Sequence, residues 1–179
     1  MADTRLTDLT AITTPAADDS LYIVDKSDTT DNAAGSSRKI TVDDLVMGYA
    51  LHFVTGGAFN PADATTYFFG NQPFAPITGG TSRPIWIPRA GIVKAIYGTM
   101  LSGVVGTSEN STVNFRLNDT TDTAISTTLD LSASRHDFSN TALAITVAAG
   151  DYCALKWVTP TWATNPTSVA IAGTIFIEH

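Results

Sequence analysis

From residue 51 onward the chain is a series of short stretches that favour β-strands, separated by turn residues. We predict strands at 51–59, 65–69, 83–88, 92–102, 111–118, 124–131, 141–147, 151–158 and 168–178. Many short strands with turn signals between them are typical of a β-sandwich or a barrel. Charged residues make up only 15% of the chain, so Thr, Ser, Asn and Gly must cover much of the surface. The sequence therefore predicts a mainly β fold.

Local signals refine three of these strands. Pro84 and Pro88 remove backbone donors on either side of residues 85–87, which predicts a short strand near a sheet edge. Gly91 and Gly150 each precede a strand, where a glycine able to take positive φ is expected. The second glycine belongs to a turn that we interpret as a hairpin between residues 142–147 and 151–158.

The last strand is mostly apolar on both of its faces, with small residues in one register. A strand of this kind is covered on both sides. It is therefore expected either inside the sandwich or packed against another subunit.

Residues 1–50 form a separate segment with little apolar surface. We predict a β-hairpin, with strands at Ser20–Asp25 and Arg38–Ile40, followed by a short helix from Val42 to about Ala50. Thr41 is a good N-cap for that helix. A segment of about 45 residues without cysteine rarely builds a sufficient core. Another copy of the chain or a larger assembly is expected to bury it, and residues 51–179 form the second domain.

Charge and cysteine content exclude several classes of protein. The net charge is −7, and residues 1–50 contribute nine acids against four bases, which gives −5. Binding to a phosphate backbone needs clustered Lys and Arg, so no nucleic-acid partner is expected. No secretory signal and no apolar run of membrane-spanning length occurs. Cys153 is the only cysteine, which excludes an internal disulfide and predicts a buried thiol.

The N-terminal segment carries a specific resemblance. The stretch LTDLTAITTPAADDSLYIVDKSD, followed by GSSRKITVDDLV, is similar to an N-terminal module of many tailed-bacteriophage virion proteins, including tail fibres and head fibres. The shared features are the L-x-D-L opening, the D-D before L-Y-x-V-D, and the K-I-T-x-x-D-L close. The resemblance covers about a quarter of the chain and implies an anchoring or trimerising role. The virion-anchoring residues that it implies are Leu6, Leu9, Asp19, Tyr22, Val24, Arg38, Lys39 and Leu45.

The region from residue 51 also resembles the jelly-roll tips of phage fibres and decoration proteins. The resemblance rests on the I-P-x-A-G strand entry, the A-A-G-D-Y turn and the amphipathic closing strand. It implies an antiparallel jelly-roll-like β-sandwich. No collagen-like tract or heptad stalk is present, which favours a squat knob over a long fibre.

Together these features predict a non-enzymatic virion protein that is assembled in the cytoplasm of the host bacterium. We expect a homotrimeric capsid decoration or head-fibre knob, docked on the capsid or on another virion protein through its N-terminal segment. The alternative is a tail-fibre receptor-binding protein whose exposed loops bind host surface glycans.

Candidate catalytic and metal-binding groups are weak. Residues 134–137 combine Ser, His and Asp, but neighbours on an extended chain point to opposite faces, and a polar loop is expected there. His52, His136 and His179 lack the spacing of zinc ligands. No cofactor, metal or catalytic residue is therefore predicted.

Two tryptophans near the C-terminus are the best candidates for contacts. Trp157 is expected to end a strand in the core, whereas Trp162 lies in a loop rich in Pro and Thr. For Trp162, subunit packing, a place in the core and glycan contact all remain open. The residues predicted at a subunit interface or ligand contact are Trp162, Trp157, Ile175 and Ile177.

Overall fold

The computed structural model describes residues 20–25, 30, 36–41, 48–54, 57–71, 76–78 and 84–179. The chain divides into two compact units, Met1–Met47 and Gly48–His179. The described residues contain no helix, and so none that could cross a membrane. Residues 42–47 of the predicted helix lie outside the described residues, and residues 48–50 begin a strand instead.

The N-terminal unit contains the predicted hairpin. Strands β1 (Ser20–Asp25) and β2 (Ser36–Thr41) pair antiparallel, with Tyr22 opposite Lys39 and Val24 opposite Ser37. The hairpin prediction is confirmed, although β2 begins two residues before the expected strand. Leu6, Leu9, Asp19 and Leu45 lie outside the described residues. The anchoring role of this segment stays a prediction.

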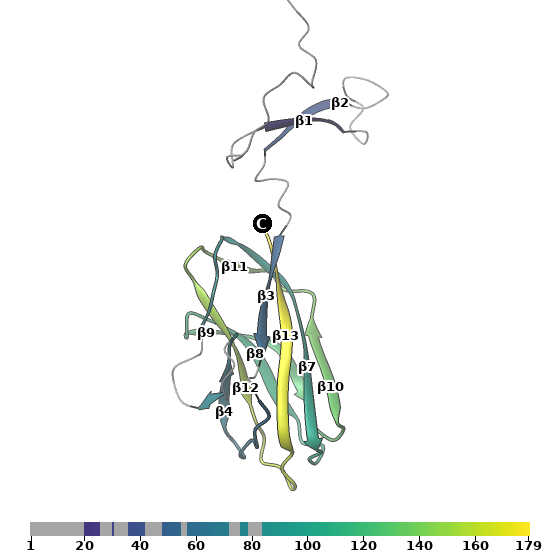
Figure 1. Cartoon of the computed structure of the whole chain (residues 1–179), viewed down its shortest axis with the longest axis vertical. Helices are drawn as coiled ribbons and strands as arrows, with labels where there is room; N and C mark the ends of the chain where they lie inside the picture. Colours follow the sequence, from purple (N-terminus) through teal and green to yellow (C-terminus); the bar gives the residue numbers. More distant parts are fainter. Residues whose placement is uncertain are drawn as a thin grey trace, which may run out of the picture. The chain divides into compact units, whose positions relative to one another are not determined.

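The second unit is built from two antiparallel sheets, and Figure 1 labels most of their strands. We call the first the β7 sheet, with strand order β10-β7-β13-β3, and β11 also pairs with β7. We call the other the β12 sheet, with order β5-β4-β12-β8-β9, and β6 also pairs with β12. The strands are β3 (Gly48–Val54), β4 (Thr66–Phe69), β5 (Ile77–Thr78), β6 (Ile85–Trp86), β7 (Gly91–Val104), β8 (Ser111–Leu117), β9 (Thr121–Leu129), β10 (Arg135–Asn140), β11 (Ile145–Val147), β12 (Tyr152–Val158) and β13 (Thr167–Glu178).

The connections between the sheets define a jelly roll. The chain changes sheet six times: after β3, β6, β7, β9, β11 and β12. The order β3-β13-β7-β10 therefore lies opposite β4-β12-β8-β9, which is the double Greek-key arrangement of eight main strands. The predicted mainly β, jelly-roll-like sandwich is confirmed.

The core lies between the sheets and is centred on aromatic side chains. The Trp157 indole is fully buried and packs against Phe59, Tyr67, Phe69 and Trp162, with ring centroids 5.7–6.3 Å apart. Such tilted and edge-on pairs add to the stabilisation from burial. The prediction that Trp157 lies in the core is confirmed.

One inward-facing row across the β7 sheet has a phenylalanine on each outer strand and a glycine on each of the two central strands. Phe138 lies opposite Gly98, Gly98 opposite Gly173, and Gly173 opposite Phe53. A Cβ atom on Gly98 would overlap the ring of Phe138, and one on Gly173 would overlap the ring of Phe53. The two rings from the outer strands thus lie over the two central glycines and fill the space that side chains would take.

Three sequence predictions are corrected by the structure. Residues 135–140 form strand β10 rather than a polar loop. The turn at Gly150 has the expected positive φ of 88° but joins β11 of one sheet to β12 of the other, so it does not close a hairpin. Gly91 has no positive φ, and a Cβ there would instead collide with the backbone oxygen of Glu178.

The last strand is also corrected in part. β13 lies between β7 and β3, and Val169, Ile171, Ile175 and Ile177 face the core. Its other face is open among the described residues, because Phe176 is 45% exposed and Ala172 is exposed. The described part of the chain therefore buries the strand on one side, and packing of the other side against another subunit stays a prediction.

Candidate functional site

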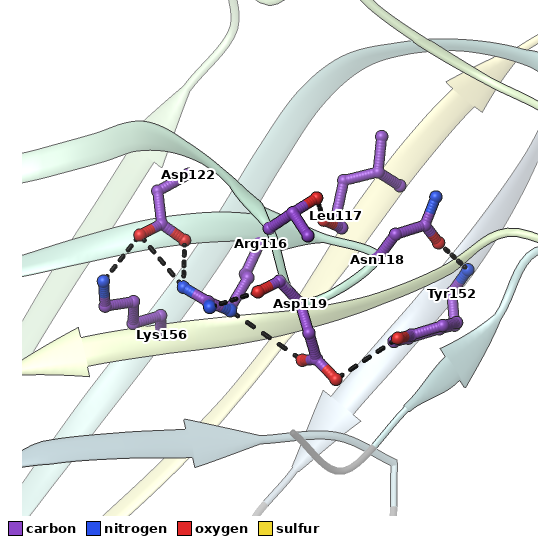
Figure 2. A network of polar contacts seen from close by, with 8 residues as sticks. Arg116, Leu117, Asn118, Asp119, Asp122, Tyr152 and Lys156 are labelled. Atoms are coloured by element: carbon purple, nitrogen blue, oxygen red, sulfur yellow. Dashed lines mark hydrogen bonds and ion pairs between the residues drawn. The ribbon is translucent and has the colours of Figure 1, made fainter. Parts of the chain in front are cut away.

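The outer face of the β12 sheet carries a network of charged side chains, shown in Figure 2. Arg116 donates to both oxygens of Asp122 at 2.9 and 3.1 Å, and the Nζ of Lys156 lies 2.5 Å from the same carboxylate. Arg116 also donates to the backbone oxygen of Asp119, whose Oδ2 accepts from the Tyr152 hydroxyl at 3.3 Å. Two cations and two carboxylates thus neutralise one another.

This network has a structural role in holding the turn between β8 and β9. Asn118 and Asp119 both have positive φ, at 49° and 56°, and Thr120 N donates to the Leu117 oxygen. Two central residues with positive φ define a tight hairpin turn of the type that Asn and Asp favour. The guanidinium of Arg116 also lies over the ring of Phe68, 5.4 Å from its centroid. With its charges occupied by one another, the network leaves little capacity for a ligand.

The outer face of the β7 sheet is different, because large apolar side chains are exposed on it. Five of them project from its strands with exposed fractions between 37% and 49%: Val54, Ile92, Tyr97, Leu101 and Phe176. The positions between them are small, as at Ala170 and Ala172. Exposed apolar side chains that gather on one surface mark an interaction site. This outer face is the candidate functional site.

A depression of about 420 Å³ lies in the middle of the outer face. Tyr97 and Thr99 come from β7, Arg135, Asp137 and Ser139 from β10, and Ala172 and Thr174 from β13. Its volume falls within the usual range of small-molecule sites. Every lining residue lies on β7, β10 or β13, so the backbone around the depression is held by the pairing of these strands.

The polar wall of the depression is an ion pair between Arg135 and Asp137. Asp137 Oδ1 accepts from Thr99 Oγ1 at 2.6 Å and from Arg135 Nε at 3.1 Å, and its Oδ2 lies 3.0 Å from an Arg135 terminal nitrogen. Hydrogen bonds from Arg135 and then Thr99 lower the pKa of the Asp137 carboxyl. The carboxylate is therefore ionised at neutral pH, and it presents an acceptor beside a guanidinium donor.

A second wall of the depression, two residues along β7 from Thr99, is aromatic. The Tyr97 ring stands edge-on to Phe176, with centroids 5.9 Å apart and an interplanar angle of 89°. A neighbouring depression of about 160 Å³ is lined by Val54, Leu101 and Ala170 and shares Thr99 and Ala172 with the first. The outer face thus has a polar and aromatic centre next to an apolar end.

The four residues predicted at an interface or ligand contact lie in the core instead. Trp162 is 4% exposed, because its loop folds back and Trp162 N donates to Asp63 Oδ1 at 3.1 Å. Trp157, Ile175 and Ile177 are buried to 2% exposure or less. Trp162 is therefore not an exposed loop side chain, and in β13 the side chain that reaches the surface is Phe176, between the two isoleucines.

Sequence reasoning missed Tyr97, Arg135 and Asp137. Arg135 and Asp137 are two residues apart on β10 and share a face, whereas His136 points away and accepts from Ala133 N at 2.8 Å. The triad-like stretch is thus split across the strand, as predicted. The sequence does carry one signal for the outer face. Thr174 and Glu178 fall at alternate positions of β13, and these polar residues identify the side of the strand that faces solvent.

No metal site is evident in the described part of the chain, which contains no group of three or more His, Cys, Asp or Glu side chains arranged to hold an ion. No protein-family model matches the chain, and no curated protein matches its sequence.

Proposed function

We propose that the chain is a non-enzymatic structural protein of a tailed-phage virion, a homotrimeric knob of the capsid-decoration or head-fibre type. In this proposal the N-terminal unit docks on the capsid or on another virion protein, and the jelly roll is displayed. The chain enters the particle during assembly in the bacterial cytoplasm.

The apolar end of the outer face is the observation that carries the self-association. Leu101 and Val54 are 49% and 43% exposed on neighbouring parts of a rigid sheet, and small residues surround them. Removing such side chains from water contributes roughly 25 cal/mol per Å² of apolar area. A second copy packed there would also cover the end of β13 around Ala170, and it would leave the depression beside Tyr97 and Asp137 open.

Sedimentation equilibrium of the full chain tests the self-association. We expect a trimer, and we expect Leu101→Lys to shift it toward the monomer because a charge would then be buried in the contact. Val105→Lys is the matched control, since Val105 is similarly exposed, at 41%, but lies in the loop after β7. A wild-type chain that is monomeric at all concentrations refutes self-association, and a trimer unaffected by Leu101→Lys refutes this contact.

Removal of residues 1–47 tests the docking role separately. The remaining unit contains all of β3 to β13 and is expected to be soluble but absent from virions produced in its presence. Normal incorporation of the shortened chain would refute the anchoring assignment, whatever the oligomeric state.

The alternative is a tail-fibre receptor-binding protein whose exposed loops bind host surface glycans. The Trp162 side chain would not make that contact, because it is 4% exposed.

A further inference from the structure

We propose that the depression between Tyr97 and the Arg135–Asp137 pair binds a neutral pyranose sugar. The inference goes beyond the structural role and does not rest on the virion assignment. It follows from three features that the depression combines: an exposed aromatic face, an acceptor and donor side by side, and a volume that fits one or two sugar rings.

The aromatic face is held in place before any ligand arrives. Tyr97 is 47% exposed, and its edge-on contact with Phe176 limits its rotation. A sugar ring presents C–H groups on one face, and an exposed aromatic ring covers these groups at low entropic cost. Tyr97 therefore supplies the stacking surface.

The polar wall suits a pair of adjacent hydroxyl groups. The Asp137 carboxylate is held by Thr99 and Arg135 and can still accept from a ligand, whereas Arg135 is 66% exposed and has N–H groups that these bonds do not use. One sugar hydroxyl can donate to the carboxylate while its neighbour accepts from the guanidinium. Thr174 and Ser139 add further hydroxyl groups to the lining.

The spacing of the two walls matches this ligand. Asp137 lies opposite Thr99 in the register of β7 and β10, and Thr99 is two residues from Tyr97. Two residues along a strand span about 7 Å, which is close to the width of a pyranose ring with its hydroxyl groups. The sugar would thus lie against Tyr97 with one edge on the Arg135–Asp137 pair.

Charge selects a neutral sugar. Arg135 and Asp137 neutralise each other, and the nearby Lys94 and Glu178 on the same face form their own ion pair at 3.0 Å. The chain as a whole carries −7. Among the described residues on this part of the face, Arg135 and Lys94 are thus both paired, and the remaining basic side chain is His52, whose Nδ1 lies 3.0 Å from Thr174 Oγ1. No unpaired Arg or Lys in this described region is left to attract a carboxylated or phosphorylated sugar.

Saturation-transfer NMR on the full chain tests the proposal, with the methyl pyranosides of glucose, mannose and galactose as neutral probes and the methyl glycoside of sialic acid as the anionic probe. We expect at least one neutral probe to bind at millimolar concentration and the anionic probe to bind more weakly. Tyr97→Ala and Asp137→Ala should each weaken binding about tenfold or more. Tyr97→Phe should retain it, because the ring remains.

Trp86→Ala is the matched control, since Trp86 is an exposed aromatic residue of the β12 sheet at 62% exposure. Circular dichroism of each variant establishes that it is folded. The proposal is overturned if no neutral probe binds, if the sialoside binds best, or if binding survives Tyr97→Ala but is lost in Trp86→Ala. Absence of binding to a chain that sediments as a trimer would indicate that another copy covers the depression, and it would equally overturn the proposal.

Discussion

Replacing Ser111 by Ala is expected to destabilise the jelly roll through one buried hydrogen-bond relay. The Trp157 indole N–H donates to Ser111 Oγ at 2.8 Å, and that hydroxyl donates to the Leu129 oxygen at 2.7 Å. Ser111 is 2% exposed and Trp157 is fully buried, so water does not replace the lost partner. The hydroxyl thus joins β8, β9 and β12 at the centre of the core.

The magnitude follows from the groups left without a partner. A buried donor that loses its acceptor costs about 1–3 kcal/mol, and a typical hydrogen bond contributes about 1 kcal/mol net. Ser111→Ala leaves the indole N–H without an acceptor and removes the hydrogen bond to the Leu129 oxygen. We therefore expect the free energy of unfolding to fall by about 2–3 kcal/mol. In a chain that already carries Trp157→Phe the indole donor is absent, and Ser111→Ala should then cost only about 1 kcal/mol.

Urea unfolding followed by circular dichroism measures all four members of this double-mutant cycle. Protein concentration is held constant because self-association would shift the midpoint. The expected coupling between the two sites is about 1–2 kcal/mol, and a coupling within about 0.5 kcal/mol of zero would refute the relay. Ser108→Ala is the control, since Ser108 is exposed and its substitution should change stability by at most about 0.5 kcal/mol.

Three further predictions use other groups of the jelly roll. Burial raises the pKa of Cys153 to about 12, so its thiol should react with Ellman's reagent at pH 9 only after unfolding, and rapid labelling of the folded chain would refute this. Burying the neutral thiol also makes the free energy of unfolding depend on pH. This contribution is complete below about pH 9 and is lost as the pH rises toward 12. Trp86 alone among the three tryptophans is exposed, so iodide should quench only its fluorescence, and quenching that persists in Trp86→Phe would contradict the fold. Gly98→Ala should lower the free energy of unfolding, measured with urea, by about 1–3 kcal/mol, because its Cβ must displace the Phe138 ring. Gly57→Ala is the control, since the space around its Cβ is open. Equal effects of the two changes would refute the packing argument.

The strands that sequence predicts well are those whose inward residues are β-branched or aromatic. β8 and β12 have buried apolar residues at alternate positions, such as Val113 and Phe115, so their period of two is visible in the sequence. β10 was missed because it is an edge strand whose only deeply buried large residue is Phe138. Edge strands carry charged side chains that discourage pairing with other molecules, and those side chains made the stretch look like a loop.

Local sequence signals do not predict which strands pair with one another in the two sheets. The turn before Asp151 was recognised correctly from Gly150, but its local sequence does not encode whether the two flanking strands share a sheet. In β13 both registers are largely apolar, and a shift of one residue exchanges the core face for the solvent face. The choice of Ile175 and Ile177 over Phe176 as surface residues followed from that ambiguity. The candidate site was missed for the same reason, because it combines residues from β7, β10 and β13.

The inward row of Phe138, Gly98, Gly173 and Phe53 links the core to the candidate site. Gly98 and Gly173 also line the depression from below, between Tyr97 and Thr99 on β7 and between Ala172 and Thr174 on β13. Because Gly98 and Gly173 have no side chains, the Phe138 and Phe53 rings lie against the backbone of the two central strands on the core side. The backbone pairing of β10 with β7 fixes Asp137 opposite Thr99, and the Phe138 ring packs over Gly98 next to this pair. A change in that packing, as in Gly98→Ala, should therefore alter the floor of the depression, because Gly98 and Phe138 both line it, while Tyr97, Arg135 and Asp137 are kept.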